Sequence, residues 1–167
     1  MPRRPLLLAA AALAAAGACR THDPRAELAV TVTETYWVID SPRGGTQYLA
    51  PAVRFRVKNV SGAPIRTIQA TANFRRVGEE ENWGSAWEQV TPASAPLQPG
   101  EDVLVVLRSD GRYTSAGDAE AMFAHEQFRD TRAEVFLRVG SSGWTKMAET
   151  PVERRVGSKT VESLGAP

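Results

Sequence analysis

The stretch Val53-Arg54-Phe55-Arg56-Val57-Lys58 is the clearest structural signal in the chain. Apolar and basic residues alternate along it, and a period of two is typical of a β-strand that buries one face. We therefore predict a strand here, with its valine and phenylalanine side chains in a core. The cations Arg54, Arg56 and Lys58 then form a basic stripe on the outer face.

A turn and a second alternating run follow this strand. The segment Asn59-Val60-Ser61-Gly62-Ala63-Pro64 has the composition of a turn. Beyond it, one apolar face is expected for Ile68, Ala70, Ala72 and Phe74. We expect the two strands to pair as antiparallel neighbours.

The same period recurs along the rest of the chain. A strand near the start is predicted to place one apolar face opposite a row of threonines; that face comprises Leu28, Val30, Val32, Tyr36 and Val38. The almost continuous apolar run Val103–Leu107 is typical of a central strand that is buried on both sides. Further strands are predicted up to Val90, from Ala133 to Val139, and from Trp144 towards Val156.

Alternation stops between Ser109 and Arg132. Within this gap, the spacing of Met122, Phe123 and Phe128 predicts one short helix, with Asp118 as its N-cap. About seven short strands separated by turns are typical of a β-sandwich. We therefore predict an all-β fold, an antiparallel immunoglobulin-like β-sandwich of about seven strands with one short helix.

The segment from about Tyr48 to Leu107 resembles the FxLYD-type and related immunoglobulin-like domains of bacterial envelope proteins. The resemblance rests on the strand end and turn at Val57–Ile65, the following strand to Phe74, and the turn Leu97-Gln98-Pro99-Gly100-Glu101. It implies an immunoglobulin-like sandwich and no defined activity.

The N-terminus has the three parts of an export signal. Arg3 and Arg4 precede an apolar stretch of about 11 residues, too short to span a bilayer, and small residues come next. The sequence Ala16-Gly17-Ala18-Cys19 resembles the lipobox of bacterial lipoproteins. This resemblance implies cleavage before Cys19 and acylation of its thiol, palmitate being one such acyl group. The alternative is an ordinary secretory signal with an incidental cysteine.

These signals predict four segments, which are a signal peptide over 1–18, a tether over 19–26, a sandwich domain over 27–156 and a flexible tail over 157–167. Acylation also accounts for the single cysteine, because an exported free thiol is prone to oxidation and cross-linking. Arg20, rather than aspartate, follows the cysteine. By resemblance to lipoprotein sorting in bacteria with two membranes, this favours the periplasmic face of the outer membrane.

Composition disfavours a nucleic-acid binder. The whole chain has 20 Lys and Arg against 19 Asp and Glu, and removal of Arg3 and Arg4 leaves 18 against 19, or −1. Phosphate contacts need a clear basic excess. Catalysis also has few candidates, because His22 and His125 are the only histidines and no nucleophile motif surrounds them. Glu79-Glu80-Glu81 is expected to be a solvated loop, and we expect no enzyme activity, metal or cofactor.

Two groups of residues are candidates for binding. Of the four tryptophans, Trp83 and Trp87 are the ones we expect to be able to stack on a ligand. The basic stripe is a candidate contact for lipid phosphates or for an acidic partner. We expect a lipid-anchored, non-catalytic binding or scaffolding module that contacts another envelope protein. A glycan- or peptidoglycan-binding module that uses exposed tryptophans is the alternative.

Overall fold

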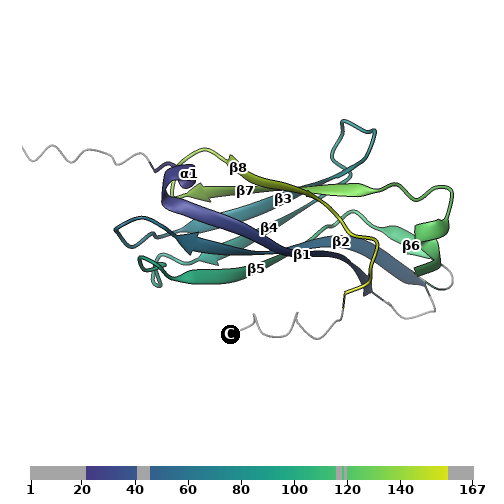
Figure 1. Ribbon diagram of the computed structural model, residues 1–167, viewed down its shortest axis with the longest axis horizontal. Helices are drawn as coiled ribbons and strands as arrows, with labels where there is room; N and C mark the ends of the chain where they lie inside the picture. The colour runs from purple at the N-terminus through teal and green to yellow at the C-terminus, as the bar shows by residue number, and fades with distance from the viewer. Residues whose placement is uncertain (1–21, 41–45, 116–117, 119, 158–167) are drawn as a thin grey trace, which may run out of the picture.

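The computed structural model describes residues 22–40, 46–115, 118 and 120–157, which form an elongated molecule of two β-sheets (Figure 1). Cys19 and the predicted signal peptide lie outside the described residues, as does the predicted tail beyond Gly157. In chain order the elements are α1 (Pro24–Glu27), β1 (Leu28–Asp40), β2 (Gln47–Asn59), β3 (Ile68–Arg76), β4 (Gly84–Thr91), β5 (Asp102–Arg108), β6 (Tyr113–Ser115), the 3₁₀ helix η1 (Glu120–Ala124), β7 (Thr131–Val139) and β8 (Thr145–Pro151).

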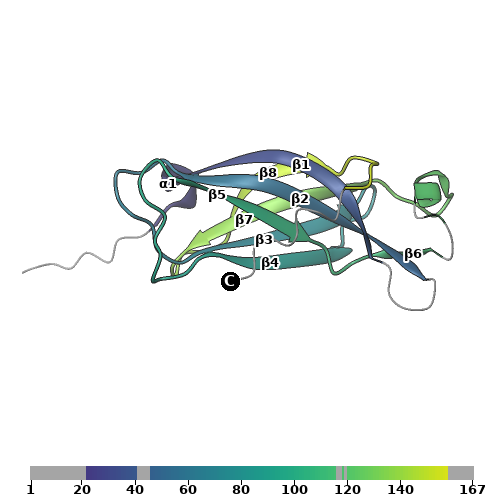
Figure 2. The same cartoon turned by 90° about the horizontal axis from the view of Figure 1, so that it is seen from below.

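Every strand pair in the two sheets is antiparallel. The first sheet has the order β1-β2-β5, with β6 also paired to β2, and the second has the order β4-β3-β7-β8. In Figure 1, β3, β7 and β8 lie above β1, β2 and β5, and in Figure 2, seen from below, the strands of the two sheets overlap. The chain places β1 and β2 in the first sheet, β3 and β4 in the second, β5 and β6 in the first and β7 and β8 in the second, so it crosses between the layers after every second strand. The predicted all-β sandwich is confirmed, with eight strands among the described residues.

The alternation in β2 is confirmed residue by residue. Val53, Phe55 and Val57 are fully buried between the sheets, whereas Arg56 and Lys58 are exposed on the outer face. The strand pairs with β1 on one side and β5 on the other. Its position inside the first sheet explains the regular pattern, because both of its edges are hydrogen-bonded and only its two faces differ.

The predicted pairing of β2 with β3 is wrong. These strands lie in different sheets, and β3 pairs with β4 and β7. The connection over 60–67 is long enough to cross from one layer to the other, unlike the two-residue turn of a tight hairpin. Thr67, just before β3, adopts a positive φ of 56° at the end of this crossing.

A β-bulge overturns the predicted face of β1. The register shifts between Val32 and Glu34, so one extra residue enters the strand and reverses the side on which later residues lie. Trp37 therefore joins the core that contains Leu28, while Tyr36 and Val38 form a separate buried cluster with Ala52.

The prediction that the run Val103–Leu107 is a central strand is also wrong. It forms β5 at the edge of the first sheet, with Leu104 43% exposed. The apolar run does not distinguish a central strand from an edge strand, because an edge strand in a sandwich also buries one face, here with Val105 and Leu107.

The predicted helix is present as the short η1, which is a 3₁₀ helix rather than an α-helix. The Asp118 carboxylate accepts a hydrogen bond from the Glu120 backbone N–H at 3.0 Å, as a capping residue does. None of its five residues is buried, so little packing is available to extend it.

The folded unit extends beyond both predicted boundaries. Asp23 caps α1 by accepting from the Arg25 N–H at 3.0 Å, so the end of the predicted tether is helical. At the other end, the Gly157 N–H donates to the Trp37 carbonyl oxygen at 2.9 Å. A Cβ on Gly157 would lie 2.1 Å from the Tyr36 ring, so only glycine fits this approach.

Asn59 fastens the loops at the α1 end of the sandwich. Its fully buried amide donates to the carbonyl oxygens of Ala63 and Leu97 at 2.8 and 2.9 Å. Its carbonyl oxygen accepts from the N–H and the hydroxyl of Ser61 at 2.9 and 2.8 Å. One side chain therefore holds both the loop after β2 and the loop before β5.

Replacement of Asn59 by alanine is expected to lower the free energy of unfolding by about 3 kcal/mol, because buried carbonyl and N–H groups lose their partners. Urea denaturation measures this change. Asn82→Ala is the matched control, because Asn82 is exposed, and it is expected to change stability by less than about 0.5 kcal/mol. Equal effects at the two positions would show that the Asn59 network contributes nothing specific.

Candidate functional site

The basic stripe on β2 is largely neutralised by its neighbours. The Arg54 guanidinium lies 2.5 Å from the Glu34 carboxylate of β1, and its side chain is only 18% exposed. Arg155 lies 2.9 Å from the same carboxylate. Both guanidinium groups lie over the Tyr36 ring, at 5.5 and 5.6 Å from its centre.

The rest of the stripe faces an acidic residue. Arg56 forms a salt bridge with Asp102 of β5, and Lys58 stands opposite Asp102 in the strand register. The three cations do lie along one face, as predicted. Carboxylates from both flanking strands pair with Arg54 and Arg56, however, so this face has less uncompensated charge to offer an acidic partner.

Trp83 packs inside an aromatic cluster at the end of the molecule opposite α1. Its ring centre lies 4.8 Å from Tyr113 and 6.2 Å from the fully buried Trp37. Arg76 covers the ring at 5.4 Å from its centre. Trp83 is therefore half-buried, and the cluster closes one end of the core.

Trp87 lies on the opposite side of the second sheet from this cluster. It stands beside Thr71, and Thr71 in turn stands beside Phe136, so the three residues form a row across β4, β3 and β7. The Trp87 side chain is 55% exposed. The two predicted tryptophans therefore cannot contribute to one binding platform.

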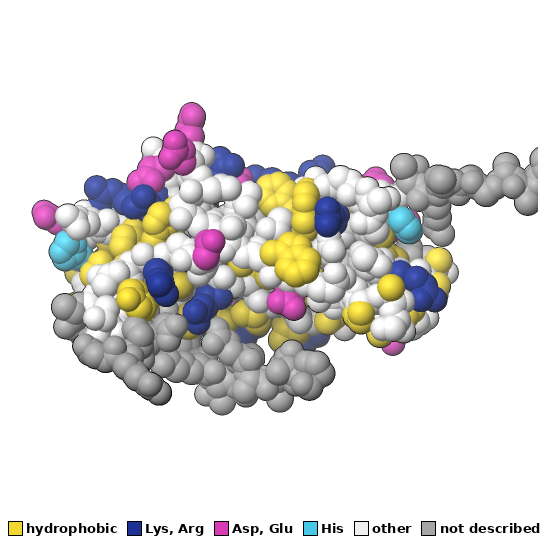
Figure 3. All heavy atoms as spheres, turned by 180° about the vertical axis from the view of Figure 1, so that it is seen from behind, with side chains coloured by type: hydrophobic (Ala, Val, Ile, Leu, Met, Phe, Trp, Pro, Cys, Tyr) yellow, Lys and Arg dark blue, Asp and Glu magenta, His cyan; other side chains and the backbone are white. Residues whose placement is uncertain are grey.

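Further residues extend this row into a surface that we call the aromatic face. Gln69 stands between Gln89 and Arg138 in the adjacent row of the sheet. Arg138 lies over the ring of Trp144, 4.8 Å from its centre, and Trp144 is 40% exposed. The aromatic face comprises Gln69, Thr71, Trp87, Gln89, Phe136, Arg138 and Trp144. Figure 3, which views the molecule from behind Figure 1, shows hydrophobic side chains near the middle of that side, with charged ones around them.

Hydrogen bonds hold the polar side chains of the aromatic face in place. The Gln69 amide donates to the Gln89 side-chain oxygen at 3.1 Å, and the Thr71 hydroxyl donates to the Ala86 carbonyl oxygen at 2.7 Å. Arg138 donates to the Gln69 side-chain oxygen. Because these groups are already ordered, binding a partner would cost little additional side-chain entropy.

An ion-pair network borders the aromatic face on β7 and β8. Glu134 is 7% exposed and lies 3.1 Å from Arg75 and 2.7 Å from Lys146. The pKa of Lys146 is raised because Glu134 and then Glu149 accept its hydrogen bonds, and the pKa of Glu149 is lowered by the bond from Lys146. This border therefore remains charged, whereas the row of Trp87, Thr71 and Phe136 has no charged side chain.

Sequence reasoning identified Trp87 but missed the other residues of the aromatic face. Phe136 carried a usable signal, because it falls among Arg132, Glu134 and Arg138 on the polar side of its strand. An aromatic residue at such a position is placed towards solvent by the strand period. The pairing of Phe136 with Trp87 across Thr71 could not be derived from one sequence, since it depends on register.

The other candidates remain separate from this surface. The histidine ring of His125 is exposed, in the turn after η1, and accepts from the Gln127 N–H at 3.2 Å. Glu79 lies 3.0 Å from Arg76 in an exposed loop. Within the described residues, no three His, Cys, Asp or Glu side chains are grouped to hold a metal ion. No helix in the same residues is long and apolar enough to cross a membrane.

The chain is therefore an all-β sandwich protein. No family model and no curated protein matches it. Among solved structures, it is similar to a Bordetella pertussis crystal structure described as an ApaA protein, with 17% identity and a TM-score of 0.41. The match covers 75% of this chain and 92% of the other. A similarity this low transfers no functional property.

Two tryptophan variants test the opposite placement of the two rings. Trp83→Ala is expected to lower the free energy of unfolding by about 2 to 3 kcal/mol, because it opens a cavity in the aromatic cluster. Trp87→Ala is the matched control and is expected to cost less than about 1 kcal/mol, because its ring is more than half exposed. Chemical denaturation of both variants measures the difference, and the reverse order would contradict the placement.

Proposed function

We propose that this protein is a lipid-anchored, non-catalytic binding module of the bacterial cell envelope, which presents the aromatic face to another envelope protein. The observation that supports this most strongly is Trp87, a large aromatic ring that is 55% exposed on β4, the edge strand of an ordered sheet face. An exposed tryptophan on a preorganised surface is costly to leave in water and is a typical anchor of a protein interface.

The composition of the aromatic face supports a protein partner. Tryptophan and arginine are the residues that contribute most to binding in interfaces, and Trp144 with Arg138 adds one stacked pair of them. The charged residues that border one side of the less polar row fit the polar rim of a protein interface. The outer side of the first sheet lacks this arrangement, since salt bridges occupy most of its cations.

The sequence around Cys19 supports the anchored part of the proposal. The export signal ends in small residues before the only cysteine, and that cysteine lies three positions before the first described residue, His22. An acylated Cys19 would hold the sandwich at one membrane surface, and Arg20 favours the periplasmic face of the outer membrane. The partner would then belong to, or reach, the same surface.

One observation favours the second candidate, a glycan- or peptidoglycan-binding module. Trp87 and Phe136 lie on one face, and the amides of Gln69 and Gln89 lie in the adjacent row of the same face. Aromatic rings stack on the apolar faces of sugars, and amides exchange hydrogen bonds with hydroxyl groups. Trp83, which sequence reasoning placed in this role, packs into the cluster at the end of the core instead.

The binding proposal is tested by capture from detergent-solubilised envelopes with the full-length acylated protein as bait. A stoichiometric protein partner is expected, and Trp87→Ala should weaken its binding about thirtyfold, as loss of a hot-spot residue does. Val77→Ala is the control, because Val77 is 59% exposed in the loop between β3 and β4 and outside the aromatic face. Retention on isolated peptidoglycan that depends on Trp87 would favour the glycan candidate. If Trp87→Ala weakens neither the capture of a protein partner nor the retention on peptidoglycan, the aromatic face is excluded as the binding surface.

The anchor is tested separately by Cys19→Ser. Three long acyl chains contribute on the order of tens of kcal/mol to membrane attachment, so the variant is expected to move from the membrane pellet to the soluble fraction. Fractionation followed by immunoblotting measures this redistribution. A variant that stays in the pellet in the amount of the parent protein would exclude acylation of Cys19 as the anchor.

A further inference from the structure

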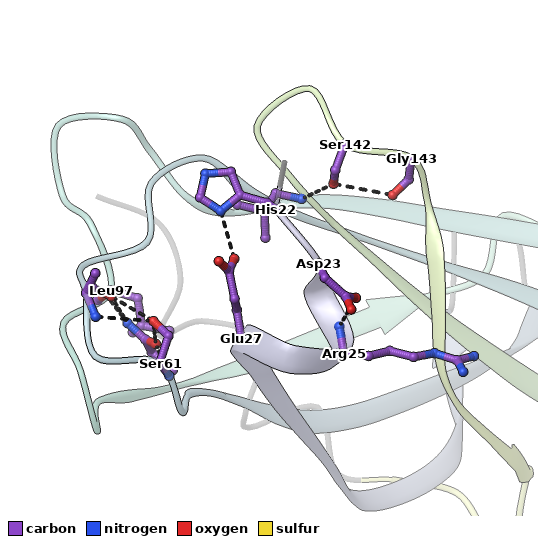
Figure 4. A network of polar contacts seen from close by, with 11 residues as sticks. His22, Asp23, Arg25, Glu27, Ser61, Leu97, Ser142 and Gly143 are labelled. Carbon is purple, nitrogen blue, oxygen red and sulfur yellow. Dashed lines mark hydrogen bonds and ion pairs between the residues drawn. The ribbon is translucent and has the colours of Figure 1, made fainter. Parts of the chain in front are cut away.

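The distance from Cys19 to the folded domain is short. His22 is the first described residue, and its ring lies 2.7 Å from the carboxylate of Glu27, the last residue of α1, as Figure 4 shows. Three Cα–Cα steps separate Cys19 from His22, and even fully extended they reach only about 11 Å. The headgroup layer of one leaflet is itself about 5 to 8 Å thick. A lipid on Cys19 would therefore bring the α1 end of the sandwich against the headgroups.

The surface at that end has both apolar and cationic side chains. A shallow groove of about 520 Å³ opens between β1 and β8, and Leu28, Val30, Val60, Met147, Arg25 and Lys146 are among the residues that line it. Val60 is 53% exposed although it is a large apolar residue, and its N–H donates to the Glu27 carbonyl oxygen at 2.9 Å. The apolar wall of the groove is thus fixed directly to α1.

Arg25 provides a cation that is available to a ligand. It is exposed, and its guanidinium donates to the Lys146 carbonyl oxygen at 3.1 Å. In the part of the chain that the structure describes, it forms no ion pair. This differs from Arg54, Arg56 and Lys146, each of which contacts a carboxylate. The remaining N–H groups of a guanidinium suit a phosphate, with which arginine forms paired hydrogen bonds.

We propose that the α1 end docks on the phospholipid headgroups of the leaflet that holds the lipid on Cys19, with Arg25 bound to a lipid phosphate and Val60 inserted among the headgroups. This inference rests on the proposed lipid anchor and adds a second, orienting contact to it. Charge complementarity between a free guanidinium and a phosphate, and the short chain before His22, both select the membrane surface as the occupant. The groove then aligns the long axis of the sandwich away from the membrane, so that the aromatic cluster around Trp83 lies at the far end.

The proposal is tested with full-length acylated protein reconstituted into vesicles of phosphatidylcholine and phosphatidylglycerol. Val60→Cys and Val77→Cys are labelled with an environment-sensitive fluorophore, since Cys19 is acylated and is the only native cysteine. The two valines are matched, being 53% and 59% exposed; the Val60 N–H donates to Glu27 of α1, whereas the Val77 N–H donates to Asp130, just before β7. The probe at position 60 is expected to emit at shorter wavelength and to lose most of its intensity to nitroxide-labelled lipids, whereas the probe at position 77 is expected to keep its emission.

A second pair of variants tests the phosphate contact. Arg25→Ala in the Val60 probe protein is expected to reduce quenching. Arg112 is the control, because it is exposed just before β6, over the Tyr48 ring, and Arg112→Ala is expected to leave quenching unchanged. Vesicle flotation separates the two proposals. Protein that floats with the vesicles but gives equal emission at the two positions would overturn docking and leave the anchor intact. Protein that does not float would overturn the anchor, and docking with it.

Discussion

Burial of one face of β2 is the interaction on which the rest of the structure depends. Val53, Phe55 and Val57 are fully buried between the sheets, and such side chains each stabilise the fold by roughly 1.5 to 3 kcal/mol. β2 also pairs with β1, β5 and β6, so its position fixes every other strand of the first sheet. No disulfide can assist within a chain that has one cysteine. Packing and backbone hydrogen bonds therefore define the sandwich.

The two ends of the sandwich are closed in different ways. At the α1 end, the buried Asn59 amide connects two loops through hydrogen bonds. At the other end, Trp37 packs against Trp83, Tyr113, Phe123 and Phe128. The polar closure leaves short loops and the exposed Val60 at the end nearest Cys19, whereas the aromatic closure packs five large rings against one another.

The two outer faces differ for a related reason. Carboxylates from β1 and β5 pair with Arg54 and Arg56 of β2 on the first sheet, so most of the charge of the basic stripe is compensated. On the second sheet, Glu134 and Lys146 concentrate the ion pairs at one side and leave Trp87 and Phe136 without charges between them. The aromatic face is thus a product of strand order, and a lipid anchor near α1 would present it alongside the long axis of the domain rather than at its tip.

The sequence by itself determined the secondary structure class and the inward and outward residues of β2 and β3, because a period of two follows from backbone geometry alone. It also indicated the turn at Asn59 and the placement of Asp118 before a short helix. Only the tertiary structure decided that β2 and β3 belong to different sheets, that β5 is an edge strand, and that the bulge after Val32 reverses the later part of β1. It also decided that Trp83 and Trp87 lie on opposite sides of the second sheet. These outcomes depend on register and on which layers meet, and such long-range pairings leave no period in the local sequence.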